Sequence, residues 1–78
     1  MEKLISFLTW LEEQQIHYRL SKIRESILVE VAVPGQRWEI EFFEDGEILI
    51  EKFQSTAQLQ SLTQLDELMQ ELSPFADL

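Results

Sequence analysis

The feature that most constrains the fold is an alternation of apolar and polar side chains that continues across two turn signals. Every second residue is apolar from Ile27 to Val33, and the alternation recurs at 38–42 and 48–50. A period of two is typical of a strand that buries one of its two faces. The pattern therefore predicts three strands, at residues 27–33, 37–43 and 47–53.

The two turns predict how these strands pair. Pro34-Gly35 suits a type II turn, because proline presets φ at the second position and glycine accepts the positive φ at the third. A two-residue loop there pairs Val31 with Trp38, Val29 with Ile40 and Ile27 with Phe42, so that all six share one face. A three-residue loop ending at a left-handed Gly46 forms a bulged hairpin that pairs Phe42 with Ile48 and Ile40 with Ile50. A slip of one residue would invert the faces, so this agreement predicts the register of an antiparallel meander.

Helical patterns flank the strands. Apolar residues recur with a helical period in residues 3–15 and again beyond residue 61. Ser61, with Gln64 three positions later, has the pattern of a capping box, and Pro74 predicts the end of the second helix. The polar residues 54–60 are expected to form a loop. Residues 16–23 alternate and predict a further strand, followed by a turn near residues 24–26.

These elements predict a two-layer α+β domain over residues 1–78. It has an N-terminal helix, an antiparallel meander of three strands (four if residues 16–23 pair with it) and a C-terminal helix, with both helices on one face of the sheet. The predicted core comprises Leu4, Phe7, Leu8, Leu11, Val29, Val31, Trp38, Ile40, Phe42, Ile48, Ile50, Leu65, Leu68 and Leu72.

Charge and composition exclude several classes of function. Fifteen acids and six bases give a net charge of −9, which repels nucleic-acid phosphates and anionic membranes. The chain has no cysteine, and therefore no disulfide or thiolate metal site. It shows neither a signal-peptide pattern nor an apolar run of roughly 20 residues that would span a membrane. We expect a cytoplasmic protein without nucleic-acid or membrane partners.

Motifs for catalysis are also absent from the sequence. Both glycines fall in predicted turns, so that no phosphate-binding loop exists, and no metalloprotease or nucleophile-elbow pattern occurs. His17 is the single histidine and has no nucleophile or carboxylate at a suggestive spacing. We interpret it as a surface residue, and we expect a non-enzyme without a cofactor or bound metal.

Acidic residues concentrate on the sheet face that the predicted helices leave uncovered. No base occurs from residue 39 to residue 51, and the register sets Glu30 directly opposite Glu39, where like charges repel. A solvated face, a docking surface for a basic protein and a divalent-cation site all fit this pattern, although the spacing is not that of an EF-hand. The same face would also serve an accessory subunit or a homodimer. The predicted partner-binding residues are Glu30, Glu39, Glu41, Phe43, Glu51 and Phe53.

Residues 31–46, which read V-A-V-P-G-Q-R-W-E-I-E-F-F-E-D-G and are followed by Ile48, Glu51 and Phe53, support one resemblance. This stretch resembles a group of small uncharacterised bacterial proteins that share a V-P-G-x-R-W-E-I-E-F core, an upstream helix and a leucine-rich C-terminal helix. The resemblance covers most of the chain and implies a bacterial cytosolic protein, but it brings no activity, ligand or catalytic residue. By analogy of size and charge alone, a docking role would include immunity or antitoxin proteins.

Overall fold

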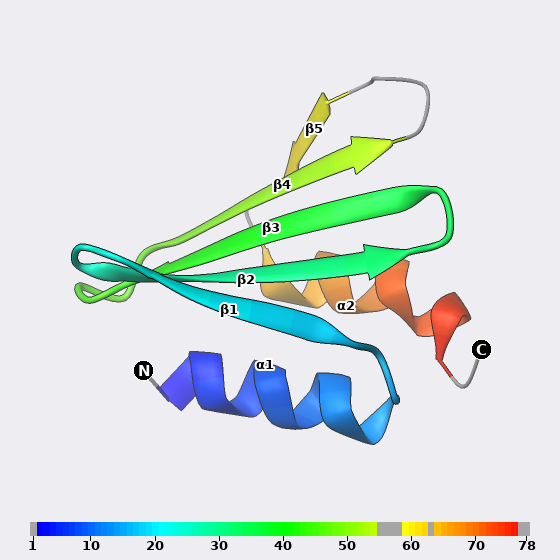
Figure 1. Ribbon diagram of the computed structural model, residues 1–78, viewed down its shortest axis with the longest axis horizontal. Helices are drawn as coiled ribbons and strands as arrows, with labels where there is room; N and C mark the ends of the chain where they lie inside the picture. Colours follow the sequence, from blue (N-terminus) through cyan, green and yellow to red (C-terminus); the bar gives the residue numbers. More distant parts are fainter. Residues whose placement is uncertain (1, 55–58, 63, 77–78) are drawn as a thin grey trace.

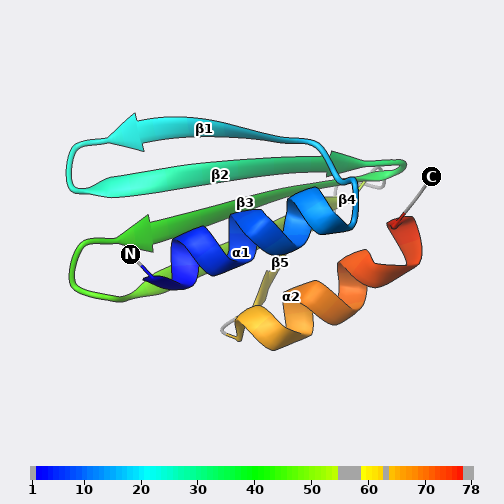
Figure 2. The same cartoon turned by 90° about the horizontal axis from the view of Figure 1, so that it is seen from below.

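The computed structural model describes residues 2–54, 59–62 and 64–76 of the chain. Within these residues, one antiparallel sheet has the strand order β1-β2-β3-β4-β5, and both helices lie on one of its faces (Figures 1 and 2). The predicted two-layer α+β fold is confirmed, and the sheet has five strands where the sequence predicted three or four. The elements in chain order are α1 (Glu2–Glu13), β1 (Tyr18–Ile23), β2 (Ser26–Val33), β3 (Gln36–Phe43), β4 (Ile48–Gln54), β5 (Leu59–Leu62), α2 (Leu65–Leu72) and the short 3-10 helix η1 (Ser73–Phe75).

The register of the central strands agrees with the prediction at every pair. Val31 lies opposite Trp38, Val29 opposite Ile40, and Ile40 in turn opposite Ile50. Gly35 has a φ of +80° and Gly46 a φ of +97°, as the two turns require. In the β3–β4 hairpin the Gly46 amide donates to the Phe43 carbonyl at 3.0 Å, and the Phe43 amide donates to the Glu47 carbonyl at 2.9 Å. These two bonds close the predicted three-residue loop.

The chain leaves α1 through a Schellman motif. Gln15 has a φ of +60°, the amide of Ile16 donates to the Leu11 carbonyl, and the amide of Gln15 donates to the Glu12 carbonyl. A hydrophobic residue after the left-handed position commonly folds back onto the helix, and Ile16 is buried accordingly. The predicted strand at 16–23 therefore begins two residues later, at Tyr18.

Strand β1 pairs with β2 along its whole length and is the fourth strand that the sequence left open. The turn between them consists of Arg24 and Glu25, so that Ile23 lies opposite Ser26. Arg24 has a φ of +51°, a conformation that glycine or asparagine adopts at lower cost. The sequence carries no glycine there, which is why the position of this turn was the hardest to predict.

The region before α2 corrects two predictions. Three residues of the predicted loop at 54–60 belong to strands: Gln54 is the last residue of β4, and Leu59 and Gln60 lie in β5, which pairs with β4. Residues 55–58 lie outside the described part of the chain. Ser61 also belongs to β5, opposite Glu51, and so cannot cap a helix. Helix α2 begins at Leu65, and its N-cap residue Gln64 makes no side-chain capping hydrogen bond. Pairing with an open sheet edge outweighed the local capping pattern.

The core lies between the sheet and the two helices. Leu8, Ile48 and Leu65, predicted as core, are only partly buried at its margin, and Ile16 is buried although it was not predicted. No helix among the described residues is long and apolar enough to cross a membrane. The buried apolar residues are Leu4, Phe7, Leu11, Ile16, Val29, Val31, Trp38, Ile40, Phe42, Ile50, Leu68 and Leu72.

Candidate functional site on the outer face of the sheet

The face of the sheet opposite the helices, hereafter the outer face, carries side chains in rows that cross the strands. Because alternate residues of a strand point to the same face, the register determines the members of each row. The rows are Ala32, Arg37 and Phe53; then Arg19, Glu30, Glu39 and Glu51; then Ser21, Leu28, Glu41 and Leu49; and finally Ile23, Ser26 and Phe43. All six predicted partner-binding residues lie on this face.

Glu30, Glu39 and Glu51 form the glutamate row, three carboxylates on three neighbouring strands. Glu39 is directly opposite both of the others, and Glu51 is exposed while Glu30 and Glu39 are half-buried. Like charges directly opposite one another destabilise a sheet. Within the described residues, the row has one ion pair, a loose contact of 3.8 Å between Arg37 Nη2 and Glu39 Oε2.

Glu41 differs from the glutamate row because the fold supplies it with a close donor. The hydroxyl of Ser26, a buried residue on β2, donates to Glu41 Oε2 at 2.5 Å. A carboxylate that accepts a hydrogen bond within its own sheet is less available to a partner. Glu41 therefore contributes charge to the outer face more than it contributes a free acceptor.

The two phenylalanines do not form a common patch. Phe53 lies opposite Arg37 near the beginning of β3, whereas Phe43 is the last residue of that strand. The Arg37 guanidinium carbon lies 4.6 Å from the centroid of the Phe53 ring, so a cation–π contact already covers this ring. Among the residues of this face whose side chains are described, Leu49, 54% exposed, is the large apolar residue most open to solvent.

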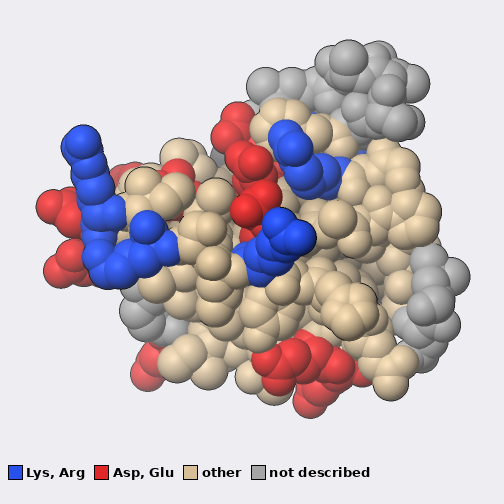
Figure 3. All heavy atoms as spheres, in the orientation of Figure 1, with Lys and Arg blue, Asp and Glu red and all other residues tan. Residues whose placement is uncertain are grey.

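Two arginines accompany the acids and were not among the predicted partner-binding residues. Arg19 stands opposite Glu30, and Arg37 lies in the neighbouring row. Figure 3 views this face and shows a band of acidic side chains with basic side chains beside it. The register that placed the glutamates on the outer face also places these arginines there. Their position could therefore be inferred from the alternation of residues 17–21 and from the V-P-G-x-R motif.

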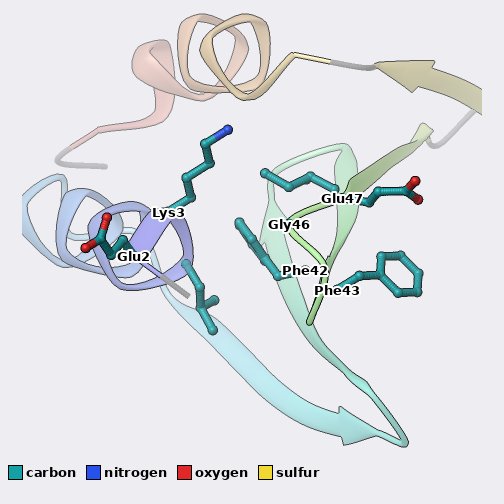
Figure 4. A pocket seen from close by; sticks show the side chains of 8 residues that line it. Glu2, Lys3, Phe42, Phe43, Gly46 and Glu47 are labelled. Atoms are coloured by element: carbon teal, nitrogen blue, oxygen red, sulfur yellow. The ribbon is translucent and has the colours of Figure 1, made fainter.

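Other parts of the described surface bring fewer functional side chains together. A hollow of about 310 Å³ lies between α1 and the β3–β4 hairpin, with Leu4, Phe42 and Ile48 among its lining residues. Glu2 and Glu47 border it, but their side chains point away from one another (Figure 4). In the described part of the chain, no three His, Asp or Glu side chains gather as they would around a metal ion.

Tyr18 forms a hydrogen bond that raises its pKa. Its hydroxyl donates to Glu12 Oε2 at 2.6 Å. That hydrogen bond, with smaller contributions from desolvation and from the charge of Glu12, raises the pKa of Tyr18 above its ordinary value of 10.0. The contact ties β1 to α1 and lies outside the outer face.

Comparisons with protein-family models, with curated proteins and with solved structures each found no match to this chain.

Proposed function

We propose that this chain is a non-catalytic protein-binding module of the bacterial cytoplasm that docks a basic partner on the outer face. The observation that carries the proposal is the glutamate row. Three carboxylates lie side by side on adjacent strands, and the described residues offer them one loose ion pair. This arrangement costs stability in the free domain, and a partner that presents lysine or arginine would remove that cost.

Charge would act mainly on the rate of association. A net charge of −9 attracts a basic partner before contact, and such steering is screened over about 8 Å at physiological salt. Apolar contacts would then hold the complex, since buried apolar anchors carry much of the energy of an interface. Leu49 and the half-buried Phe43 are the candidates for that role. A toxin-blocking immunity protein would be one form of this function.

A second candidate is self-association through the same face. Arg19 and Arg37 lie beside the glutamate row, so the face carries both signs of charge. In an isologous dimer the same face of each copy meets the other, and an axis near the glutamate row would set the arginines of one copy against the glutamates of its partner. Sedimentation equilibrium of the purified protein separates the two proposals, because a dimer would assemble without any other protein.

The test is a comparison of three baits in a pull-down from the native host. The first is the unaltered protein, the second carries E39K and E41K on the outer face, and the third carries E13K and E67K on exposed helical positions. The second and third variants change the net charge equally, and they differ in the face that is altered. A partner retained by the first and third baits and lost by the second supports the proposal.

Association kinetics with the captured partner then distinguish steering from anchoring. We expect E39K/E41K to slow association and L49A to speed dissociation. Equal losses in the outer-face and helical variants would mean that net charge alone is sensed. Unchanged binding of the outer-face variant would move the interface to another surface.

A further inference from the structure

A second hollow, of about 570 Å³, lies beside the start of β1. It is lined by residues from β1, β2 and β3 and from the segment that precedes β1, among them His17, Arg19, Ala32 and Arg37. Ala32 and Arg37 are opposite one another, and Arg19 is opposite Glu30 in the next row. Ala32 has a shorter side chain than Arg19 and Arg37, which line the same hollow.

Positive charges outnumber negative charges around this hollow, because Arg19 and Arg37 line it with one acid. Two of the six lysines and arginines of the chain, together with its single histidine, line it, while Glu30 is the one acid in the lining. This sign is opposite to that of the chain as a whole. His17 and Arg19 are exposed, and within the described residues Arg19 makes no ion pair.

Arg37 is held in position and keeps donors open to solvent. Its guanidinium carbon lies 4.6 Å from the Phe53 ring centroid, and its pairing with Glu39, at 3.8 Å, is beyond hydrogen-bonding distance. The side chain of Arg37 remains 55% exposed. A guanidinium that rests on an aromatic face loses less freedom when it binds, and its fork of N–H donors matches the oxygens of a carboxylate or phosphate.

We propose that this hollow binds a compact anionic group, a carboxylate or a phosphate, with Arg37 and Arg19 as donors and Ala32 as the floor. A polyanion does not fit, because the glutamate row lies next to the hollow and would repel its additional negative charges. The proposal does not depend on a basic partner protein. Its donors are Arg19 and Arg37, whereas the docking proposal rests on the glutamate row, so either proposal can fail while the other stands.

The experiment is a nuclear magnetic resonance titration of the full chain with inorganic phosphate and, separately, with acetate. Sodium chloride keeps the ionic strength constant, so that general screening is the same at every point. The ring signals of His17 report on the hollow without ambiguity, because the chain has no other histidine. We expect saturable shifts at His17 and in the backbone around Ala32 with at least one anion. Saturation with phosphate alone identifies a phosphate site, and saturation with acetate identifies a carboxylate site.

Three variants test the assignment of the residues. R37Q removes the principal donor, and the loss of a hydrogen bond to a charged group should weaken binding about tenfold or more. A32L fills the hollow but keeps both arginines, and we expect it to abolish saturation. R24Q removes the same charge from the β1–β2 turn, outside the lining of the hollow, and should bind like the unaltered chain. Unperturbed core signals in each spectrum show that the variant is folded.

The result that supports the proposal is saturable binding that R24Q retains and that R37Q and A32L lose. Shifts that grow linearly with either anion overturn it, because they indicate only diffuse attraction to surface charge. Equal weakening in R37Q and R24Q overturns it as well, and so does an A32L variant that binds normally.

Discussion

Lys52 provides the sharpest test of how the two layers are held together. It lies opposite Trp38 on the inner face of the sheet, with its side chain 5% exposed. Its Nζ is 3.0 Å from Glu71 Oε2 on α2 and 5.2 Å from the centroid of the Trp38 ring. Removing Glu71 leaves the ammonium buried with the aromatic ring and without a counter-charge. Breaking a fully buried pair costs about 3–5 kcal/mol.

The side chain of Glu71 is itself 38% exposed, so water reaches the carboxylate side of the pair. We therefore expect Glu71→Ala to cost about 1–3 kcal/mol, the penalty of an unsatisfied buried group rather than that of a fully buried charge. Lys52→Met should behave differently, because it removes the charge and its desolvation penalty together and keeps a flexible chain of similar length. Its effect should lie within about 1 kcal/mol of zero or be stabilising.

Urea unfolding of the two single variants and the double variant measures these values as a thermodynamic cycle. In the Lys52→Met background, Glu71→Ala should cost much less than in the unaltered chain, because no ammonium remains to be left without a partner. The reasoning fails if Lys52→Met destabilises more than Glu71→Ala. That order would mean that Lys52 contributes through the pair and the Trp38 contact more than its desolvation costs.

Three further predictions concern the core, a turn and a titration. Ile40 is fully buried on the central strand, so Ile40→Ala should cost about 2–5 kcal/mol in urea unfolding, and a loss below about 0.5 kcal/mol would contradict its place in the core. A Cβ added at Gly46 would meet no atom within 4 Å, so Gly46→Val should lower the thermal midpoint more than Gly46→Asn through backbone conformation alone, and equal midpoints would refute this. The single tyrosine allows a direct ultraviolet titration, in which the pKa of Tyr18 should exceed 10.0 and fall towards it in Glu12→Gln. Because the folded-state pKa is raised, the stabilisation from this contact should be complete below pH 10 and lost as the pH rises through the folded-state value, whereas an unchanged pKa in Glu12→Gln would exclude Glu12 as the cause.

The sheet was predictable where the turns carry residues with restricted or permissive backbones. Gly35 and Gly46 defined two loops, and the alternation on either side then allowed one register. The β1–β2 turn places Arg24 at a positive φ, and no glycine or asparagine in the sequence marks that position. Strand β5 has four residues and lies at the edge of the sheet, so its formation depends on a neighbouring strand more than on its own pattern.

Predictability of the candidate site was also uneven. Periodicity assigned each glutamate to the outer face, because a side chain's face follows from its position in the strand. The same register pairs Trp38 with Lys52 and so implies a buried lysine. The core prediction counted only apolar residues and therefore did not include Lys52. The hollow over Ala32 depends on the relative sizes of side chains on three strands and on the stacking of Arg37 upon Phe53. Such packing is set by tertiary structure and leaves no periodic signal.

The strand order has a consequence for how the chain reaches its native state. Each described strand pairs with the next strand along the chain, in the order β1-β2-β3-β4-β5. Pairing between these strands therefore does not require the entropic cost of closing a long loop. Proteins dominated by such local pairings fold faster than those with distant pairings. We expect the β2–β3 and β3–β4 hairpins to organise the folding transition state, since their turns are the best defined by sequence. The two helices would join this nucleus later, and their removal from the sheet would mark the first step of unfolding.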